Sequence, residues 1–191
     1  MNLPNKLTVM RMALIPVFLV FMLFPAIPWR FLWAALVFGA ASYTDYLDGH
    51  IARRDGLVTN FGKLMDPLAD KLLVFSAILC FIPLQMTSAL AAFVILAREL
   101  LVTSVRLIAA EHGRVIAADK WGKLKTVFQI IWILVTLLTL WMVEIFQYLP
   151  PQLMEIAWLL CVVLQWLVIV LTVASGWNYI SKNADLFDDI H

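Results

Sequence analysis

The dominant feature of the sequence is a series of long stretches without a charged residue. These uncharged stretches occupy residues 12–29, 31–44, 72–97, 126–143 and 156–181. Because the hydrocarbon core of a bilayer takes roughly 20 helical residues, such stretches are typical of transmembrane helices. Of the 191 residues, 63% are hydrophobic and 14% are charged, whereas soluble domains carry about 25% charged residues. A compact domain of this length could not bury so many apolar side chains. The sequence therefore predicts an integral membrane protein and excludes a soluble enzyme and a nucleic-acid-binding protein.

Six membrane-spanning helices account for the whole chain as a single membrane domain, residues 1–191. Pro83 and the polar residues that follow it divide the long stretch 72–97 into two helices, because proline interrupts a helix. The predicted spans are about 7–24, 31–54, 62–82, 87–111, 121–146 and 153–181. The expected fold class is therefore all-α integral membrane, with six transmembrane helices.

The basic residues predict how these helices are oriented. All lysines and arginines except Arg30 lie near the termini, near the link between the second and third spans, or near the link between the fourth and fifth. The positive-inside rule places both termini and these two links in the cytoplasm. Cys80 and Cys161 lie inside apolar stretches, which favours buried free thiols over a disulfide. No cleavable signal peptide is expected, which favours a multi-pass protein of a bacterial inner membrane.

Four aspartates mark the cytoplasmic ends of the second and third spans. They are Asp45, Asp48, Asp66 and Asp70. The i,i+3 and i,i+4 spacings place each pair on one helix face, and Gly49 and Gly62 leave space on these faces. Ionisable residues within a membrane helix are costly, and their default interpretation is functional. Converging carboxylates would repel each other without bound cations, and their hard oxygen atoms suit Mg²⁺, Mn²⁺ or Ca²⁺.

Each aspartate also has a purely structural interpretation. Asp66 precedes Pro67, as an N-cap precedes a proline at the first helical position. Asp48 could pair with Arg53 or Arg54, and Asp70 with Lys71 or Lys63. The four acids together, beside glycines, favour a cation site.

Residues 45–70 match the pattern D-x2-D-G-x2-A-R-x8-G-x3-D-x3-D at every fixed position. This pattern resembles the signature of the CDP-alcohol phosphotransferase family, and six helices with cytoplasmic termini also agree with that family. The resemblance implies a centre of two divalent ions, Mg²⁺ or Mn²⁺, bound by Asp45, Asp48, Asp66 and Asp70. It also implies that Asp70 acts as the general base and that the protein is a homodimer.

The same resemblance implies a site for CDP-diacylglycerol. Its expected residues within or near the motif are Gly49, Arg53, Thr59 and Gly62. The opening segment, with Asn5, Thr8 and Arg11, resembles the family's N-terminal segment over the nucleotide. The alternative is that this segment is only the capped, amphipathic start of the first span.

Basic residues on the fourth and fifth spans suggest a site for a phosphorylated acceptor. The candidates are Arg98, Ser104 (or Thr103), Arg106, Lys123 and Lys125. Arginines and lysines at a membrane edge suit a dianionic phosphate. The patterns R-E-x4-S-x-R and G-K-x-K-T resemble those of phosphatidylglycerophosphate synthases, which implies transfer of a phosphatidyl group from CDP-diacylglycerol to glycerol 3-phosphate.

Several alternatives remain open at this point. Arg98 and Glu99 could form an intramembrane ion pair, and the lysines could only contact anionic membrane lipids. A phosphatidylinositol-phosphate-type synthase would also need a cationic phosphate site. A cation-coupled transporter also binds ions through intramembrane acids, but the paired repeats typical of transporters are not found. A non-catalytic scaffold has no use for four acids beside glycines.

Overall fold

The computed structural model describes the backbone of residues 3–55, 60–111, 120–145 and 150–183. Within these ranges it describes all side chains except those of residues 3–5, 45–55, 60–64, 66, 67 and 111.

The described chain is all-α, as predicted, and contains no strand within these ranges. Its six helices each lie within a few residues of a predicted span. They are α1 (Leu3–Leu23), α2 (Arg30–Asp55), α3 (Asn60–Phe81), α4 (Ala89–Glu111), α5 (Lys120–Ile145) and α6 (Pro151–Lys182). The split of the apolar stretch 72–97 into α3 and α4 is confirmed.

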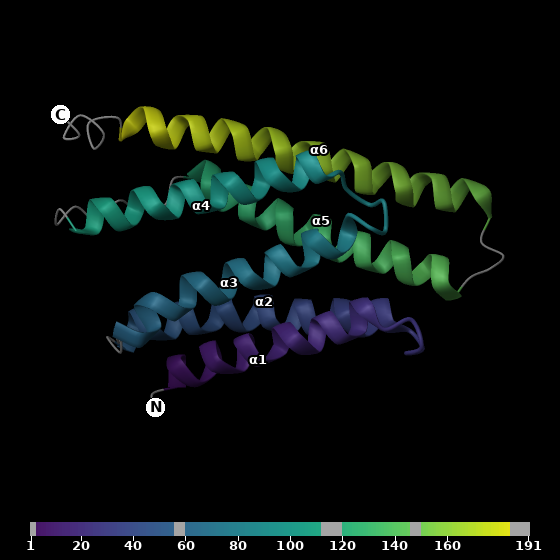
Figure 1. The fold of residues 1–191 in the computed structure, drawn as a ribbon, viewed down its shortest axis with the longest axis horizontal. Helices are drawn as coiled ribbons and strands as arrows, with labels where there is room; N and C mark the ends of the chain where they lie inside the picture. The colour runs from purple at the N-terminus through teal and green to yellow at the C-terminus, as the bar shows by residue number, and fades with distance from the viewer. Residues whose placement is uncertain (1–2, 56–59, 112–119, 146–149, 184–191) are drawn as a thin grey trace.

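Successive helices run in opposite directions (Figure 1). The first residues of α1, α3 and α5 and the last residues of α2, α4 and α6 therefore lie at the same end of the molecule, on the left in Figure 1. We call this the charged end, because Lys6, Lys120, Lys123 and Lys182 lie there. Helix α1 packs against α2 and α3, α4 packs against α6, and α5 contacts both α2 and α6. Helix α5 thus joins the two halves of the bundle.

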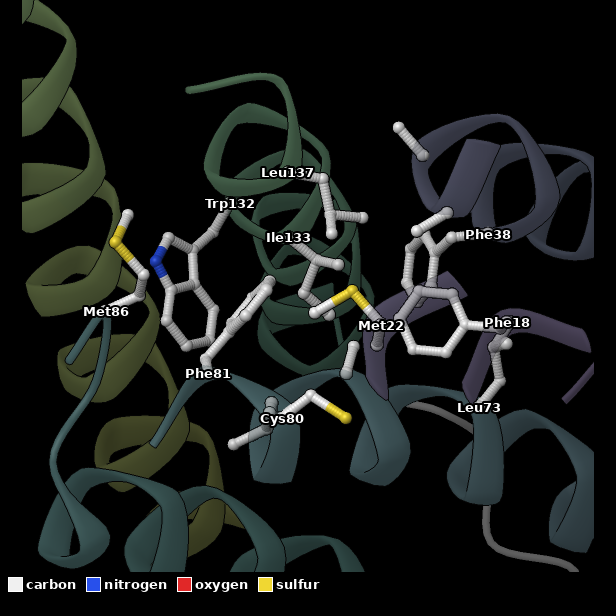
Figure 2. Close-up of a cluster of buried hydrophobic side chains, with 14 of the residues drawn as sticks. Phe18, Met22, Phe38, Leu73, Cys80, Phe81, Met86, Trp132, Ile133 and Leu137 are labelled. Atoms are coloured by element: carbon white, nitrogen blue, oxygen red, sulfur yellow. The ribbon is translucent and has the colours of Figure 1, made fainter. Parts of the chain in front are cut away.

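Aromatic and aliphatic side chains fill the interior between α1, α2, α3 and α5 (Figure 2). The rings of Phe18 and Phe38 lie 6.0 Å apart, and Phe81 meets Trp132 edge to face at 5.9 Å. Such tilted contacts are favourable geometries for aromatic rings. Cys80 and Cys161 are both buried and free, as the sequence predicted. The core lies away from the charged end and fixes the helices that carry the polar residues.

The outer surface of the bundle is also apolar. On α6, for example, Ile156, Leu159, Trp166 and Trp177 are each more than half exposed, which is expected of a face in contact with lipid. Three helices of the described chain are long and apolar enough to cross a membrane, over Lys6–Leu23, Lys120–Ile145 and Pro151–Lys182. The prediction of a multi-pass membrane protein is thus supported by three helices rather than all six. The other three helices, α2, α3 and α4, carry the acidic residues of the candidate site.

Candidate active site

The acidic motif lies on α2 and α3, towards the charged end. Asp45 and Asp48 belong to α2, and Asp66 and Asp70 belong to α3. Of these four, only the Asp70 side chain is among the described residues, and it is partly buried. The predicted residues that lie outside the described side chains are Asn5, Asp45, Asp48, Gly49, Arg53, Thr59, Gly62 and Asp66. The backbone therefore places the two acidic segments on neighbouring antiparallel helices.

Asp70 borders a small cavity where four helices meet. The cavity has a volume of about 70 Å³. Its lining residues are Ser42 from α2, Asp70, Lys71, Val74 and Phe75 from α3, Glu99 from α4, and Thr126, Gln129 and Ile130 from α5. Residues that carry hydroxyl, amide, ammonium and carboxylate groups thus line one partly open cavity beside Asp70.

Glu99 is the centre of a buried charge cluster next to this cavity. Its Oε1 accepts a hydrogen bond from Lys125 Nζ at 2.6 Å and another from Arg98 Nη1 at 3.1 Å. Lys125 Nζ also donates to Gln129 Oε1. The exposed fraction of the side chain is 1% for Lys125, 13% for Arg98 and 18% for Glu99. Buried charges need such partners because their desolvation is costly.

The cluster and Asp70 belong to one electrostatic unit. Asp70 interacts with Lys125 through charge, and Lys71 interacts with Glu99. The ion pair between Arg98 and Glu99, which the sequence left as an alternative, is therefore present, and Lys125 joins it from another helix. Both carboxylates and cations lie beside the cavity, so a polar ligand there can interact with negatively and positively charged groups.

Two glycines make room for the Arg98 side chain. A Cβ atom at Gly176 on α6 would lie 3.1 Å from Arg98 Cγ, and one at Gly122 on α5 would lie 3.5 Å from Nη2. The arginine therefore extends from α4 along the backbones of α5 and α6. Small residues permit this close approach between membrane helices.

The other predicted phosphate ligands lie apart from the cluster. Arg106 donates from Nε to the hydroxyl of Tyr179 at 3.3 Å, and its guanidinium carbon lies 5.6 Å from the centre of the tyrosine ring. Ser104 is exposed and donates to the carbonyl of Leu100 at 3.1 Å. Lys123 is also exposed. The structure thus brings together Arg98 and Lys125 of the predicted set.

Thr8 and Arg11 lie on the inner face of α1. They are one turn apart, and their exposed fractions are 1% and 0%. A fully buried arginine is rare in proteins. Of the predicted donor-binding residues, these are the two whose side chains are described.

Sequence reasoning missed Gln129, Tyr179 and Ser42 as candidate site residues. Gln129 could have been found, because it is a polar residue in an apolar stretch and lies at i+4 from Lys125, on the same helix face. Tyr179 and Ser42 lie on other helices, and only the packing brings them to this region.

Comparison with known proteins agrees with these observations. A sequence model described as CDP-alcohol phosphatidyltransferase matches residues 1–177. The chain is 42% identical, over 95% of both chains, to the CDP-diacylglycerol–glycerol-3-phosphate 3-phosphatidyltransferase of Bacillus subtilis (strain 168). Proteins of the same name from Rickettsia bellii (strain RML369-C) and Pseudomonas fluorescens are 41% and 37% identical. These alignments cover 67% and 72% of this chain and 70% and 72% of the relatives. The chain belongs to the CDP-alcohol phosphatidyltransferase family, and it is a transferase.

Proposed function

We propose that this enzyme transfers the phosphatidyl group from CDP-diacylglycerol to sn-glycerol 3-phosphate, giving phosphatidylglycerophosphate and CMP. One structural observation carries the proposal: Asp70 borders a cavity that Glu99 also lines, and Glu99 binds the two buried cations Arg98 and Lys125. A base and two cations that suit an anionic acceptor thus lie close together. The similarity to relatives that carry this activity in their names supports the same substrates.

Asp70 is the residue proposed to activate the acceptor. The 1-hydroxyl of glycerol 3-phosphate loses its proton to the Asp70 carboxylate as its oxygen attacks the phosphorus that bears the diacylglycerol. The bond from this phosphorus to the CMP oxygen breaks, and CMP leaves. The cavity would give the acceptor hydroxyl access to Asp70 from the side of α4 and α5.

Arg98 and Lys125 are proposed to bind the acceptor phosphate. Both are held in place by Glu99, so little side-chain freedom remains to be lost on binding. Arg98 Nε is buried and has no hydrogen-bond partner among the described residues. A phosphate oxygen would supply one, because guanidinium groups bind phosphates through several parallel donors. Ser104, Arg106 and Lys123 are proposed to add charge and hydrogen bonds nearer the protein surface.

The carboxylates of Asp45, Asp48, Asp66 and Asp70 are proposed to bind two divalent cations, Mg²⁺ or Mn²⁺. An all-oxygen carboxylate set from two neighbouring helices fits these ions. When bound, the ions would neutralise the diphosphate and stabilise the leaving group. Asn5, Thr8, Arg11, Gly49, Arg53, Thr59 and Gly62 are proposed to contact CDP-diacylglycerol.

All six helices are proposed to span a bacterial inner membrane, with both termini and the charged end in the cytoplasm. Lysines gather at that end, whereas Arg30 lies at the other, as the positive-inside rule requires. The site then lies where a lipid donor and a water-soluble acceptor can meet. We further propose that the enzyme is a homodimer.

CMP release from CDP-diacylglycerol in detergent tests the proposed function. Release should require both glycerol 3-phosphate and a divalent metal, and it should stop when EDTA removes the metal. Other acceptors, including inositol phosphate and neutral glycerol, should support little release. A preference for inositol phosphate would contradict the proposed acceptor and favour a phosphatidylinositol-phosphate-type synthase.

Asp70→Asn should lower kcat at least about 100-fold, because general-base catalysis contributes a factor of this order. Glu155→Gln is the matched control, since Glu155 is exposed at the opposite end of the bundle and should retain activity. Size-exclusion chromatography in detergent checks that both variants are folded. An Asp70→Asn variant that is folded and fully active would contradict the role of Asp70.

A further inference from the structure

We infer that Gln129 determines acceptor specificity, by donating a hydrogen bond from its amide nitrogen to the hydroxyl of glycerol 3-phosphate that does not react. This inference rests on the proposed function and extends it to a residue that the sequence motifs do not include. Gln129 lies on α5 and lines the same cavity as Asp70.

The orientation of the Gln129 amide is fixed by Lys125. The Lys125 ammonium donates to Gln129 Oε1, and an ammonium has no acceptor atom to offer in return. The amide oxygen must therefore face Lys125, and the opposite orientation would set two donors against each other. Because Lys125 is itself held by Glu99 at 2.6 Å, the amide is oriented by a chain of fixed contacts.

The other end of this amide lacks a partner. Gln129 is 3% exposed, and its Nε2 is buried without a hydrogen-bond partner among the described residues. An unsatisfied buried donor is costly in a folded protein. A ligand with an acceptor oxygen in the adjoining cavity would satisfy it, so the arrangement fits a site prepared for a hydroxyl group.

The cavity fits a short polyol. One water molecule needs roughly 10–15 Å³ of such space, so a volume of about 70 Å³ holds a few connected atoms of that size but not a large ring. Asp70 and Gln129 also offer complementary groups, because a carboxylate accepts a proton and an amide N–H donates one. We therefore assign the reacting 1-hydroxyl to Asp70 and the 2-hydroxyl to Gln129.

An acceptor without the 2-hydroxyl tests this assignment directly. The probe is 3-hydroxypropyl phosphate, which keeps the phosphate and the reacting hydroxyl. The wild-type enzyme should prefer glycerol 3-phosphate over this analogue by roughly tenfold or more in kcat/KM, because a site built to bind a hydroxyl rejects a substrate that lacks it. In Gln129→Met the preference should fall to about one, while the KM for CDP-diacylglycerol stays unchanged.

A control variant tests whether the effect is specific to Gln129. Gln165→Met is the matched control, because Gln165 donates to Thr87 and neither residue lines the cavity. This control should keep the wild-type preference.

The outcomes distinguish this inference from the proposed function. If Gln129→Met is folded and keeps the wild-type preference between the two acceptors, the role of Gln129 is wrong while the proposed function stands. If wild-type enzyme releases CMP with neither acceptor, the proposed function itself is wrong. Loss of preference in Gln129→Met, but not in Gln165→Met, supports the inference.

Discussion

At the scale of single residues, Glu99 is the residue that holds the buried cations of the site in place. Lys125 is fully buried, and its charged partner at hydrogen-bond distance is the Glu99 carboxylate, which also binds Arg98. Removing one member of a buried ion pair leaves an uncompensated charge, whereas replacing both members by apolar groups is often neutral. Glu99 therefore holds both cations in place, and its removal alone should destabilise the fold.

Glu99→Gln should lower the free energy of unfolding by about 3–5 kcal/mol, because it leaves Lys125 buried without a counter-charge. The double variant Glu99→Gln/Lys125→Met should recover most of this loss, since the buried charge is gone as well. Unfolding by SDS titration in mixed micelles measures both values. Additive losses in the double variant would show that the two residues are not coupled.

The Arg30–Glu144 pair at the opposite end provides the control for this cycle. It is longer, at 3.5 Å, and its side chains are more exposed, at 17% and 27%. Glu144→Gln should therefore cost about 1 kcal/mol or less. A cost as large as that of Glu99→Gln would mean that burial does not explain the difference.

Among the helices, α5 has the greatest influence on the site. It contributes Trp132 and Ile133 to the core and Lys125 and Gln129 to the cavity region. The same helix contacts α2 and α6. A change in how α5 packs would therefore move the polar residues relative to Asp70.

Two helical glycines should respond differently to an added side chain. A Cβ at Gly39 on α2 would lie 3.8 Å from Leu134, an ordinary contact, whereas one at Gly176 would lie 3.1 Å from Arg98 Cγ. Gly39→Ala should raise the free energy of unfolding by up to about 1 kcal/mol, because alanine loses less backbone entropy on folding. Gly176→Val should lower it by about 1–3 kcal/mol through overpacking.

The same SDS titration measures both glycine variants. Gly176→Val should also raise the KM for glycerol 3-phosphate, because it displaces Arg98, while Gly39→Ala should leave this KM unchanged. If Gly176→Val binds the acceptor like the wild-type enzyme, the position of Arg98 does not matter for the phosphate.

For the whole molecule, the alternating helices place both ends of the described chain at the charged end, on opposite sides of the bundle (Figure 1). Single cysteines can test this arrangement in sealed vesicles with a membrane-impermeant maleimide. Glu155→Cys, at the start of α6, should react in right-side-out vesicles. Lys6→Cys and Lys182→Cys should react only in inverted vesicles, because both are proposed to face the cytoplasm.

The two natural cysteines should give no background, since both are buried. The parent enzyme without added cysteines is the control. Labelling of Glu155→Cys and Lys182→Cys from the same side would contradict a membrane-spanning α6. Labelling of Lys6→Cys and Lys182→Cys from opposite sides would contradict an even number of spans.

The sequence by itself determined the helices and the family. Charge-free stretches of the length of a membrane span predict helices almost independently of their neighbours, because the backbone must satisfy its hydrogen bonds within each segment. Pro83 marked the break between α3 and α4, and the spaced aspartates identified the motif on α2 and α3. These are local features, so a single sequence contains them.

Only the tertiary structure decided which polar residues meet. Arg98, Ser104 and Arg106 were predicted as one phosphate site on α4, yet Arg98 binds Glu99, which also binds Lys125 on α5, and Arg106 binds Tyr179 on α6. Helical spacing fixes the face on which a residue lies but not the helix that faces it. The contact of Lys125 with Glu99, and the cavity that Gln129 shares with Asp70, arise because four helices converge, and that convergence is set by the packing of the apolar core.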